Sequence, residues 1–169
     1  MNNPCSLYIS QKLFSLWGKY EVQNQNGQLA MMVKGEPSLT RRQIVYDPDG
    51  KQIGSIHQVF LSFFPKFEIE IGGKSAGTIS TRPGFRLKLN LEYFGWSLRG
   101  DLIGWNYDVF DQNGNPIAQI RRELWHLTDH YAIHFSKPDD ALPLLLLALA
   151  VDCITDAMRN TANASNAAT

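Results

Sequence analysis

The sequence predicts a mainly β fold, a closed antiparallel barrel of about twelve strands wrapped around a central hydrophobic C-terminal α-helix. The first observation is that short runs of alternating apolar and polar residues fill most of the chain before residue 137. The second is a strongly apolar segment from Ala141 to Asp152, in which Leu144 to Leu147 are all leucine. Consecutive residues point in different directions around a helix, so this helix has no face left for water and must be enclosed.

The predicted strands are half-buried, since apolar side chains share one face and polar side chains the other. The alternation is clearest in residues 67–71, 87–91 and 131–135, which read FEIEI, LKLNL and YAIHF. The full set of predicted strands lies near residues 7–14, 18–23, 28–34, 41–47, 51–60, 65–71, 74–81, 86–91, 95–100, 104–111, 116–124 and 130–136.

Turn sequences and an internal repeat support this order of strands. Residues that tolerate a positive φ predict hairpin turns at 24–27, 47–50, 72–73 and 113–114. Segments 13–22, 60–69 and 124–133 align without gaps, and each carries a bulky apolar corner followed by a strand. The irregular spacing of the copies favours one closed sheet over a linear solenoid.

The apolar segment is predicted to form a helix that occupies the interior of the barrel. A barrel of more than eight strands leaves a lumen, and about twelve strands can admit a helix of roughly 10 Å diameter. We expect this helix over residues 139–159, with Asp139 and Asp140 at its N-terminus and Pro143 within its first turn.

A membrane span is not expected, although the segment is apolar. Asp152 and Asp156 interrupt the run before it reaches the roughly 20 residues that a bilayer requires. Residues 1–159 are therefore expected to form a single domain, followed by a flexible tail over the small polar residues 160–169.

The composition of the chain limits the binding partners and the cellular compartment that we expect. Sixteen Lys and Arg residues balance sixteen Asp and Glu residues, so we expect no nucleic-acid partner. Cys5 and Cys153 are far apart and lack metal-ligand spacing, which argues against a disulfide framework and a zinc site. The first residues show no basic segment followed by an apolar run, which predicts no signal peptide and a cytoplasmic location.

Five motifs occur in an order typical of one family: LYISQKLFSL at 7–16, GKYEV at 18–22, FPKFEI at 64–69, WSLRGD at 96–101 and LALAVDC at 147–153. Together they resemble the LURP-one-related (YxjI-type) family of the tubby C-terminal-like superfamily. The resemblance covers residues 6–158 and implies a twelve-stranded barrel around a C-terminal helix. Because the superfamily includes phosphoinositide-binding tubby domains and phospholipid scramblases, it also implies an association with membrane lipids, by analogy of fold.

No pattern in the sequence is typical of an enzyme, a cofactor or a metal site. The G-x-S-x-G, P-loop and H-E-x-x-H motifs are absent, and Cys153 falls on the buried helix, where cysteine is usually inert. His126, His130 and His134 are spaced by four, but the strand pattern places the last two about 13 Å apart, too far to share an ion. We expect exposed surface histidines, no enzymatic activity, no cofactor and no metal.

Basic residues give the one partner hypothesis with a physical basis, the binding of anionic phospholipid headgroups. The candidate headgroup ligands lie on or beside predicted strands, and Arg86 and Lys88 project from the same face of one strand. The complete group is Arg41, Arg42, Arg86, Lys88, Arg121 and Arg122. Exposed aromatic residues beside them, such as Trp17, Phe63, Phe64 or Trp125, would indicate a membrane-binding surface.

Two alternatives stay open at this stage. The zero net charge favours the interpretation that these are ordinary outward charges of a barrel, offset by acidic residues such as Glu68, Glu70, Glu92 and Asp101. The chain could also be a protein-interaction or small-ligand-binding scaffold, which an exposed apolar patch or an unpaired sheet edge would indicate. The expected partner is therefore an anionic membrane surface or another protein, and the expected location is cytoplasmic or peripheral to a membrane.

Overall fold

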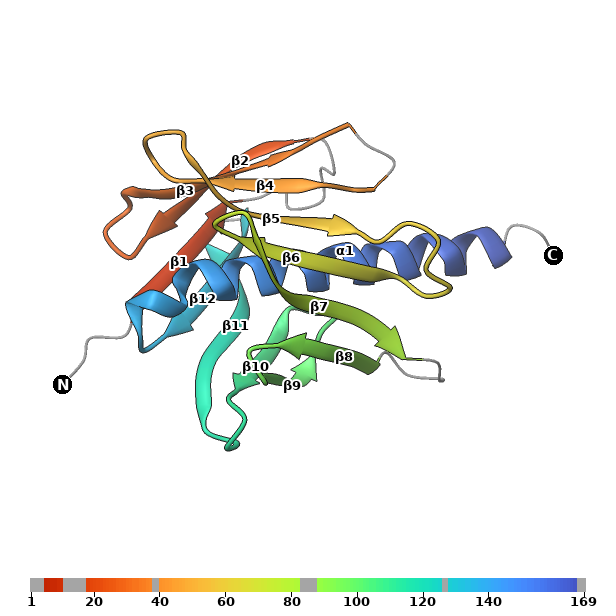
Figure 1. The fold of residues 1–169 in the computed structure, drawn as a ribbon. Helices are drawn as coiled ribbons and strands as arrows, with labels where there is room; N and C mark the ends of the chain where they lie inside the picture. Colours follow the sequence, from red (N-terminus) through yellow and green to blue (C-terminus); the bar gives the residue numbers. More distant parts are fainter. Residues whose placement is uncertain (1–4, 11–17, 38–39, 83–87, 126–127, 167–169) are drawn as a thin grey trace.

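Twelve strands and one long helix form the part of the chain that the computed structural model describes, residues 5–10, 18–37, 40–82, 88–125 and 128–166 (Figure 1). The strands are β1 (Cys5–Ser10), β2 (Lys19–Asn24), β3 (Leu29–Gly35), β4 (Gln43–Tyr46), β5 (Gln52–Gln58), β6 (Lys66–Ile71), β7 (Lys74–Arg82), β8 (Lys88–Tyr93), β9 (Ser97–Asp101), β10 (Asn106–Phe110), β11 (Pro116–Trp125) and β12 (Thr128–Phe135). A short 3₁₀ helix, η1 (Pro138–Asp140), leads into the helix α1 (Ala141–Asn166). Every predicted strand overlaps an observed one.

All twelve strands belong to one antiparallel sheet that curls into a barrel. β1 pairs with β12, with Cys5 opposite Phe135 and Ser10 opposite His130, so the first and last strands meet. β8 and β9 are the two ends of the sheet order and do not pair, although a short connection joins them. The predicted twelve-stranded barrel is confirmed. It has one open seam, which is the gap between the unpaired strands β8 and β9.

The predicted hairpin turns are also confirmed. The main-chain N–H groups of Gly27, Gly50 and Gly114 each donate to the carbonyl three residues earlier, over 2.9 to 3.0 Å. These three glycines and the pair Gly72 and Gly73 all have a positive φ, which glycine adopts without a steric penalty.

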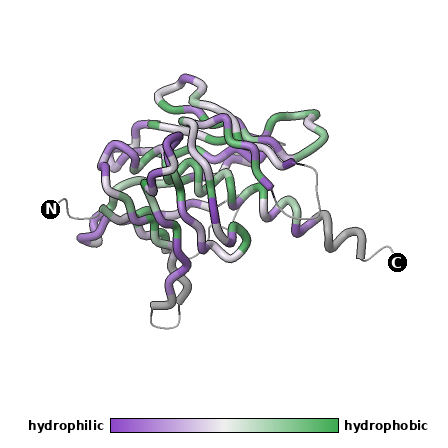
Figure 2. The backbone as a smooth tube through the Cα atoms, turned by 90° about the horizontal axis from the view of Figure 1, so that it is seen from below, coloured by the Kyte–Doolittle hydropathy of each residue, from purple (hydrophilic) through white to green (hydrophobic). Residues whose placement is uncertain are grey.

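The helix α1 runs through the middle of the barrel (Figure 1) and shows as an apolar core segment in Figure 2. Leu144 to Leu147 are completely buried, so all sides of this part of the helix contact the inside of the wall. Burying a leucine contributes about 1.5–3 kcal/mol, which makes this helix the largest single hydrophobic element of the fold.

Close contact between helix and wall requires a glycine on β5. A Cβ atom added at Gly54 would lie 2.9 Å from Cδ1 of Leu146 and 3.1 Å from the carbonyl oxygen of Glu70. The stretch Pro138–Asn160 is long and apolar enough to cross a membrane, but 67% of its most apolar window is buried inside the protein. The segment therefore serves as the core of the barrel.

The ends of the helix differ from the predicted range 139–159. Asp139 and Asp140 belong to η1, and the residue before it, Lys137, makes no side-chain cap. At the other end the helix continues to Asn166, so residues 160–166 of the predicted flexible tail are helical. No glycine or proline follows Pro143, and extending an existing helix through alanine-rich sequence costs little.

Candidate functional site

One end of the barrel is defined by the emerging C-terminal half of α1. Nη1 of Arg41 lies 3.6 Å from Oδ2 of Asp156, which places the β3–β4 connection against the helix. Nη2 of Arg159 donates a hydrogen bond of 2.9 Å to the carbonyl of Ile103, which places the β9–β10 connection there too. Because the strands alternate in direction, the β5–β6 and β7–β8 connections lie at the same end (Figure 1). We call it the helix-exit end.

A strongly apolar loop projects from the helix-exit end, between β5 and β6. The exposed fractions of Phe60, Leu61, Phe63 and Phe64 are 68%, 87%, 101% and 47%. The loop is visible as a green stretch on the side of the C-terminus in Figure 2. Contiguous exposed apolar residues of this size usually mark an interaction site. We call residues 60–64 the apolar loop.

Local contacts hold the apolar loop in its exposed conformation. The N–H of Val59 donates to the carbonyl of Lys66 over 2.8 Å and closes the base of the loop. The hydroxyl of Ser62 donates to the carbonyl of Phe64 over 2.6 Å. Leu61 has a φ of 61°, a conformation that non-glycine residues rarely adopt and that often occurs at functional sites. The backbone therefore keeps the apolar side chains outside the core.

Of the aromatic residues named from the sequence, Phe63 and Phe64 are exposed, as a membrane-binding surface requires. Trp17 and the side chain of Trp125 lie outside the described residues.

Basic side chains flank the apolar loop on both sides. The N–H of Gln58 donates to the carbonyl of Thr40 over 2.6 Å, so the β3–β4 connection adjoins the base of the loop. On the other side the N–H of Thr81 donates to the carbonyl of Pro65 over 3.1 Å. These contacts bring the cations Arg41, Arg42, Lys66, Arg82 and Lys88 to the helix-exit end.

Two of the predicted headgroup ligands at this end already have acidic partners. Arg41 pairs with Asp156, and Nη1 of Arg42 lies 3.7 Å from Oε2 of Glu36. All four side chains are partly exposed, so each pair contributes little to stability. Within the described part of the chain, Lys66 makes no ion pair and offers an unneutralised charge beside the apolar loop.

The remaining predicted ligands do not form a single cluster. Arg121 makes a salt bridge with Asp108 and donates to the carbonyl of Tyr107 over 2.8 Å, which commits it to the β10–β11 pair. Arg122 follows it on β11, while Lys88 lies on β8, separated from β11 by β9, β10 and the open seam. Arg86 lies outside the described residues. The structure therefore brings Arg41, Arg42 and Lys88 to the helix-exit end beside the apolar loop, whereas Arg121 and Arg122 lie on β11, which is not a neighbour of β8 in the sheet.

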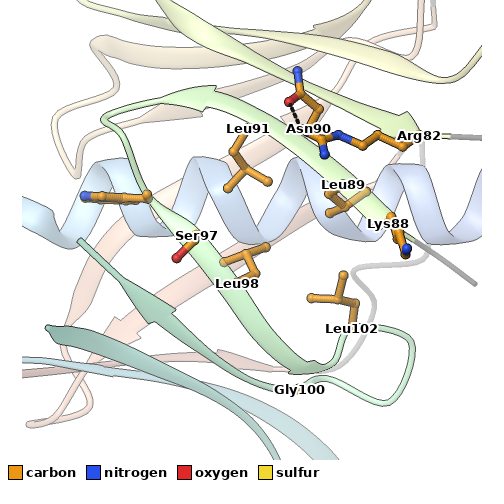
Figure 3. A pocket seen from close by; sticks show the side chains of 10 residues that line it. Arg82, Lys88, Leu89, Asn90, Leu91, Ser97, Leu98, Gly100 and Leu102 are labelled. Atoms are coloured by element: carbon orange, nitrogen blue, oxygen red, sulfur yellow. Dashed lines mark hydrogen bonds between the residues drawn. The ribbon is translucent and has the colours of Figure 1, made fainter. Parts of the chain in front are cut away.

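The open seam between β8 and β9 forms a hollow of about 430 Å³ in the wall. Figure 3 shows the two strands diverging from their connecting turn, with Leu89, Leu91 and Leu98 directed toward the gap in front of α1. The sequence pattern predicts both strands but contains no signal that they stay unpaired. Pairing across the seam depends on how far the whole sheet curls, which is a non-local property.

Comparison with known proteins agrees with this architecture. The sequence model of the family described as LURP-one-related matches residues 5–152. The chain belongs to the LURP-one-related family.

Two known proteins are similar to this LURP-one-related domain over most of its length. The uncharacterized protein YxjI of Bacillus subtilis (strain 168) is 26% identical over 151 residues, which cover 88% of this chain and 92% of YxjI. The X-ray structure of a protein from Arabidopsis thaliana is similar with a TM-score of 0.66 and 17% identity, over 90% of this chain and 92% of that one. At that identity the second likeness shows the fold alone, the tubby C-terminal-like barrel that the sequence resemblance implied.

The core of this LURP-one-related domain contains a buried carboxyl group that the sequence pattern did not single out as unusual. Asp152 of α1 is only 4% exposed, and its Oδ1 atom has no hydrogen-bond partner among the described residues. Burial, with a smaller contribution from the nearby charge of Asp156, raises the pKa of Asp152 to about 7, although Arg159 and a hydrogen bond from Trp105 act in the opposite direction. The proton on this group therefore bears on the stability of the barrel.

Among the histidines of this protein, His134 has a structural role. Nδ1 of His134 lies 2.9 Å from Oγ of Ser6, and Nε2 lies 3.1 Å from Oε1 of Glu123. His134 is half-buried, so the predicted exposed position is wrong for this residue, because it bridges β1 and β11 across β12. The side chains of His126 and His130 lie outside the described residues. Within the described ranges no three His, Cys, Asp or Glu residues are grouped to hold a metal.

A second hollow of this LURP-one-related barrel, of about 470 Å³, lies at the opposite end, where α1 begins. Its lining is mainly apolar and includes Leu7, Met31, Phe135 and Leu142. Among the described residues of that lining Asp139 is the single charged one, so this hollow does not suit an anionic ligand.

Proposed function

We propose that this LURP-one-related domain is a non-enzymatic module that binds peripherally to anionic membrane surfaces through its helix-exit end. The observation that carries the proposal is the apolar loop, whose four large side chains are exposed and flanked by cations. The proposal keeps the cytoplasmic location expected from the sequence.

The chemistry of the helix-exit end suits the boundary between water and lipid. Aromatic and leucine side chains partition into the interface, and burying one contributes about 1.5–3 kcal/mol. Each cation near an anionic surface adds about 1 kcal/mol. Lys66 lies two residues after the apolar loop, so an inserted Phe63 would bring this charge to the headgroups. Either contribution alone is marginal, and together they support reversible binding.

Sedimentation with lipid vesicles tests the proposal. We expect the protein to bind vesicles that contain phosphatidylserine, to bind neutral phosphatidylcholine vesicles less, and to dissociate at high salt. Phe63→Ser should weaken binding by about tenfold or more, because one inserted aromatic side chain is lost. Lys66→Glu should weaken binding to anionic vesicles and leave the weak binding to neutral vesicles unchanged.

Matched controls exist at the opposite end of the barrel. Phe94 is 53% exposed in the β8–β9 connection, and Lys74 is exposed at the start of β7. Phe94→Ser and Lys74→Glu should bind vesicles as the unaltered protein does. Equal losses at both ends, or no binding to anionic vesicles at all, would reject the lipid proposal.

A protein-interaction scaffold is the second candidate, and the same apolar loop supports it. An apolar patch that is exposed in the free protein can equally be covered by another protein. This candidate predicts a complex that depends on Phe63 and forms without lipid, together with no binding to vesicles.

A further inference from the structure

The open seam has the shape of a groove with one narrow and one wide end. The narrow end is the turn that joins the two strands, where the N–H of Trp96 donates to the carbonyl of Tyr93 over 3.0 Å. From this turn β8 and β9 diverge, and the wide end lies beside Lys88 and Leu102 (Figure 3). Lys88 begins β8 and Leu102 follows β9, so the groove opens toward the helix-exit end.

The floor of the groove is apolar. Leu89, Leu91, Leu98 and Leu102 line it, and all four are half-buried and pack against the core around α1. Trp96 lines the narrow end. A groove of about 430 Å³ lies within the range of about 300–1,000 Å³ that small-molecule sites occupy.

The wide end carries two cations that lie directly opposite each other. Arg82 on β7 and Lys88 on β8 are cross-strand partners, and both line the groove. Like charges in this position are normally destabilising. Glu92, which shares the outward face of β8 with Lys88, is engaged by Thr78 at 3.2 Å and by Asn90 at 3.5 Å. Within the described residues neither cation has an acidic partner, so an anion bound here would offset the repulsion.

An extended peptide fits the groove less well than an acyl chain. β8 and β9 run antiparallel, because an odd number of antiparallel steps separates them around the sheet. A strand inserted between them would pair antiparallel with one edge and parallel with the other. An acyl chain needs no hydrogen bonds from either edge, and it can lie along the leucine side chains.

We infer that the β8–β9 seam binds one free long-chain fatty acid, with its hydrocarbon chain over the leucines and its carboxylate between Arg82 and Lys88. The inference does not depend on the proposed membrane contact, because it uses neither the apolar loop nor a bilayer. It adds a soluble, anionic, single-chain ligand to the expected partners.

Trp96 provides a direct readout of this site. Titration with dibrominated stearic acid, below its micelle concentration, should quench tryptophan fluorescence in a saturable way with one molecule bound per chain. In Trp96→Phe the quenching should largely disappear, while calorimetry with oleic acid should still detect binding. Quenching that is equal in Trp96→Phe, or that never saturates, would overturn the placement in the seam.

The charge requirement is tested with variants on neighbouring strands. Lys88→Glu should weaken oleic acid binding by about tenfold or more, and Lys74→Glu, at the other end of β7, should leave it unchanged. Oleyl alcohol has the hydrocarbon chain of oleic acid but no carboxylate. It should bind weakly to Lys88→Glu, to Lys74→Glu and to the unaltered protein. An unchanged affinity in a cooperatively folded Lys88→Glu variant would overturn the inference.

The membrane-binding proposal and the fatty-acid inference can be rejected independently of each other. Phe63→Ser should lose vesicle binding and keep the affinity for oleic acid, since Phe63 does not line the seam. Binding of vesicles without binding of oleic acid leaves the membrane proposal standing and rejects the fatty acid.

Discussion

The hydroxyl group of Tyr93 donates a hydrogen bond of 2.9 Å to the main-chain carbonyl of Pro143. The bond joins the last residue of β8 to the first turns of α1, and Tyr93 is only 1% exposed. The narrow end of the seam is therefore fixed to the start of the central helix by a buried side chain, whereas the connection beyond its wide end is held by Arg159, whose Nη2 donates to the carbonyl of Ile103.

Removing this hydroxyl should weaken the barrel without changing its shape. We expect Tyr93→Phe to lower the free energy of unfolding by about 1–2 kcal/mol, because the carbonyl of Pro143 loses its partner in a buried place. Urea denaturation measures the change. Tyr46→Phe on β4 is the control, since the hydroxyl of Tyr46 makes no hydrogen bond within the described residues and its removal should be close to neutral. Equal effects of the two changes would contradict the assigned role of Tyr93.

A charge in the middle of the central helix should abolish folding. Leu146 is completely buried opposite Gly54, and Leu146→Asp would place an unpaired carboxylate in the core at a cost of several kcal/mol. We expect insoluble protein or an unfolded circular dichroism spectrum. Met158→Asp, on an exposed part of the same helix, should remain folded. A soluble Leu146→Asp variant that unfolds cooperatively would refute the buried-helix fold.

The buried carboxyl of Asp152 predicts a pH dependence of stability. An aspartate in the unfolded chain has a pKa near 3.9, about three pH units below the value of about 7 to which burial raises it here. Between these values the folded protein binds more protons than the unfolded chain, so stability should fall as the pH rises from about 4 to about 7 and stay at the lower level above that. The fall due to this group is at most about 4 kcal/mol.

Asp152→Asn isolates that contribution. Urea denaturation at pH 5 and pH 8 should show a smaller loss of stability for the variant than for the unaltered protein, because asparagine does not titrate. An identical loss in both proteins would show that Asp152 does not carry the effect.

Two glycines with positive φ should respond differently to alanine. At Gly77, where φ is 144°, an added Cβ would lie 2.0 Å from the carbonyl oxygen of Glu92, so Gly77→Ala should cost about 2 kcal/mol or more. At Gly50, where φ is 84°, the same group meets open space, and Gly50→Ala should cost about 1 kcal/mol. Thermal unfolding of both variants checks the order, and a larger loss at Gly50 would contradict it.

The local features of the fold could be predicted from the sequence because they depend on neighbouring residues. Alternation in residues 67–71 correctly placed Phe67 and Ile69 in the core, and the consecutive leucines correctly identified the central helix. The glycine turns fixed where the strands reverse, and each prediction rests on contacts within a few residues.

The candidate site could be predicted only in part because its contacts are distant in the sequence. His134 bonds with Ser6 across a separation of 128 residues, and no spacing pattern reveals such a pair. Arg121 was predicted as a headgroup ligand, but the β10–β11 register brings it to Asp108. Phe63 was named from the sequence as a residue whose exposure would indicate a membrane-binding surface, and it is exposed, whereas the groove beside Leu98 arises from the curvature of the whole sheet.

Because α1 follows all twelve strands in the sequence, the ribosome synthesises the strands of the barrel before the helix that occupies its interior. Until the leucines of α1 emerge, the inward faces of the strands have nothing to pack against, and β1 must also wait for β12. A chain stopped at Phe135 should therefore stay unfolded and sensitive to protease, and the nascent barrel should depend on chaperones for most of its synthesis.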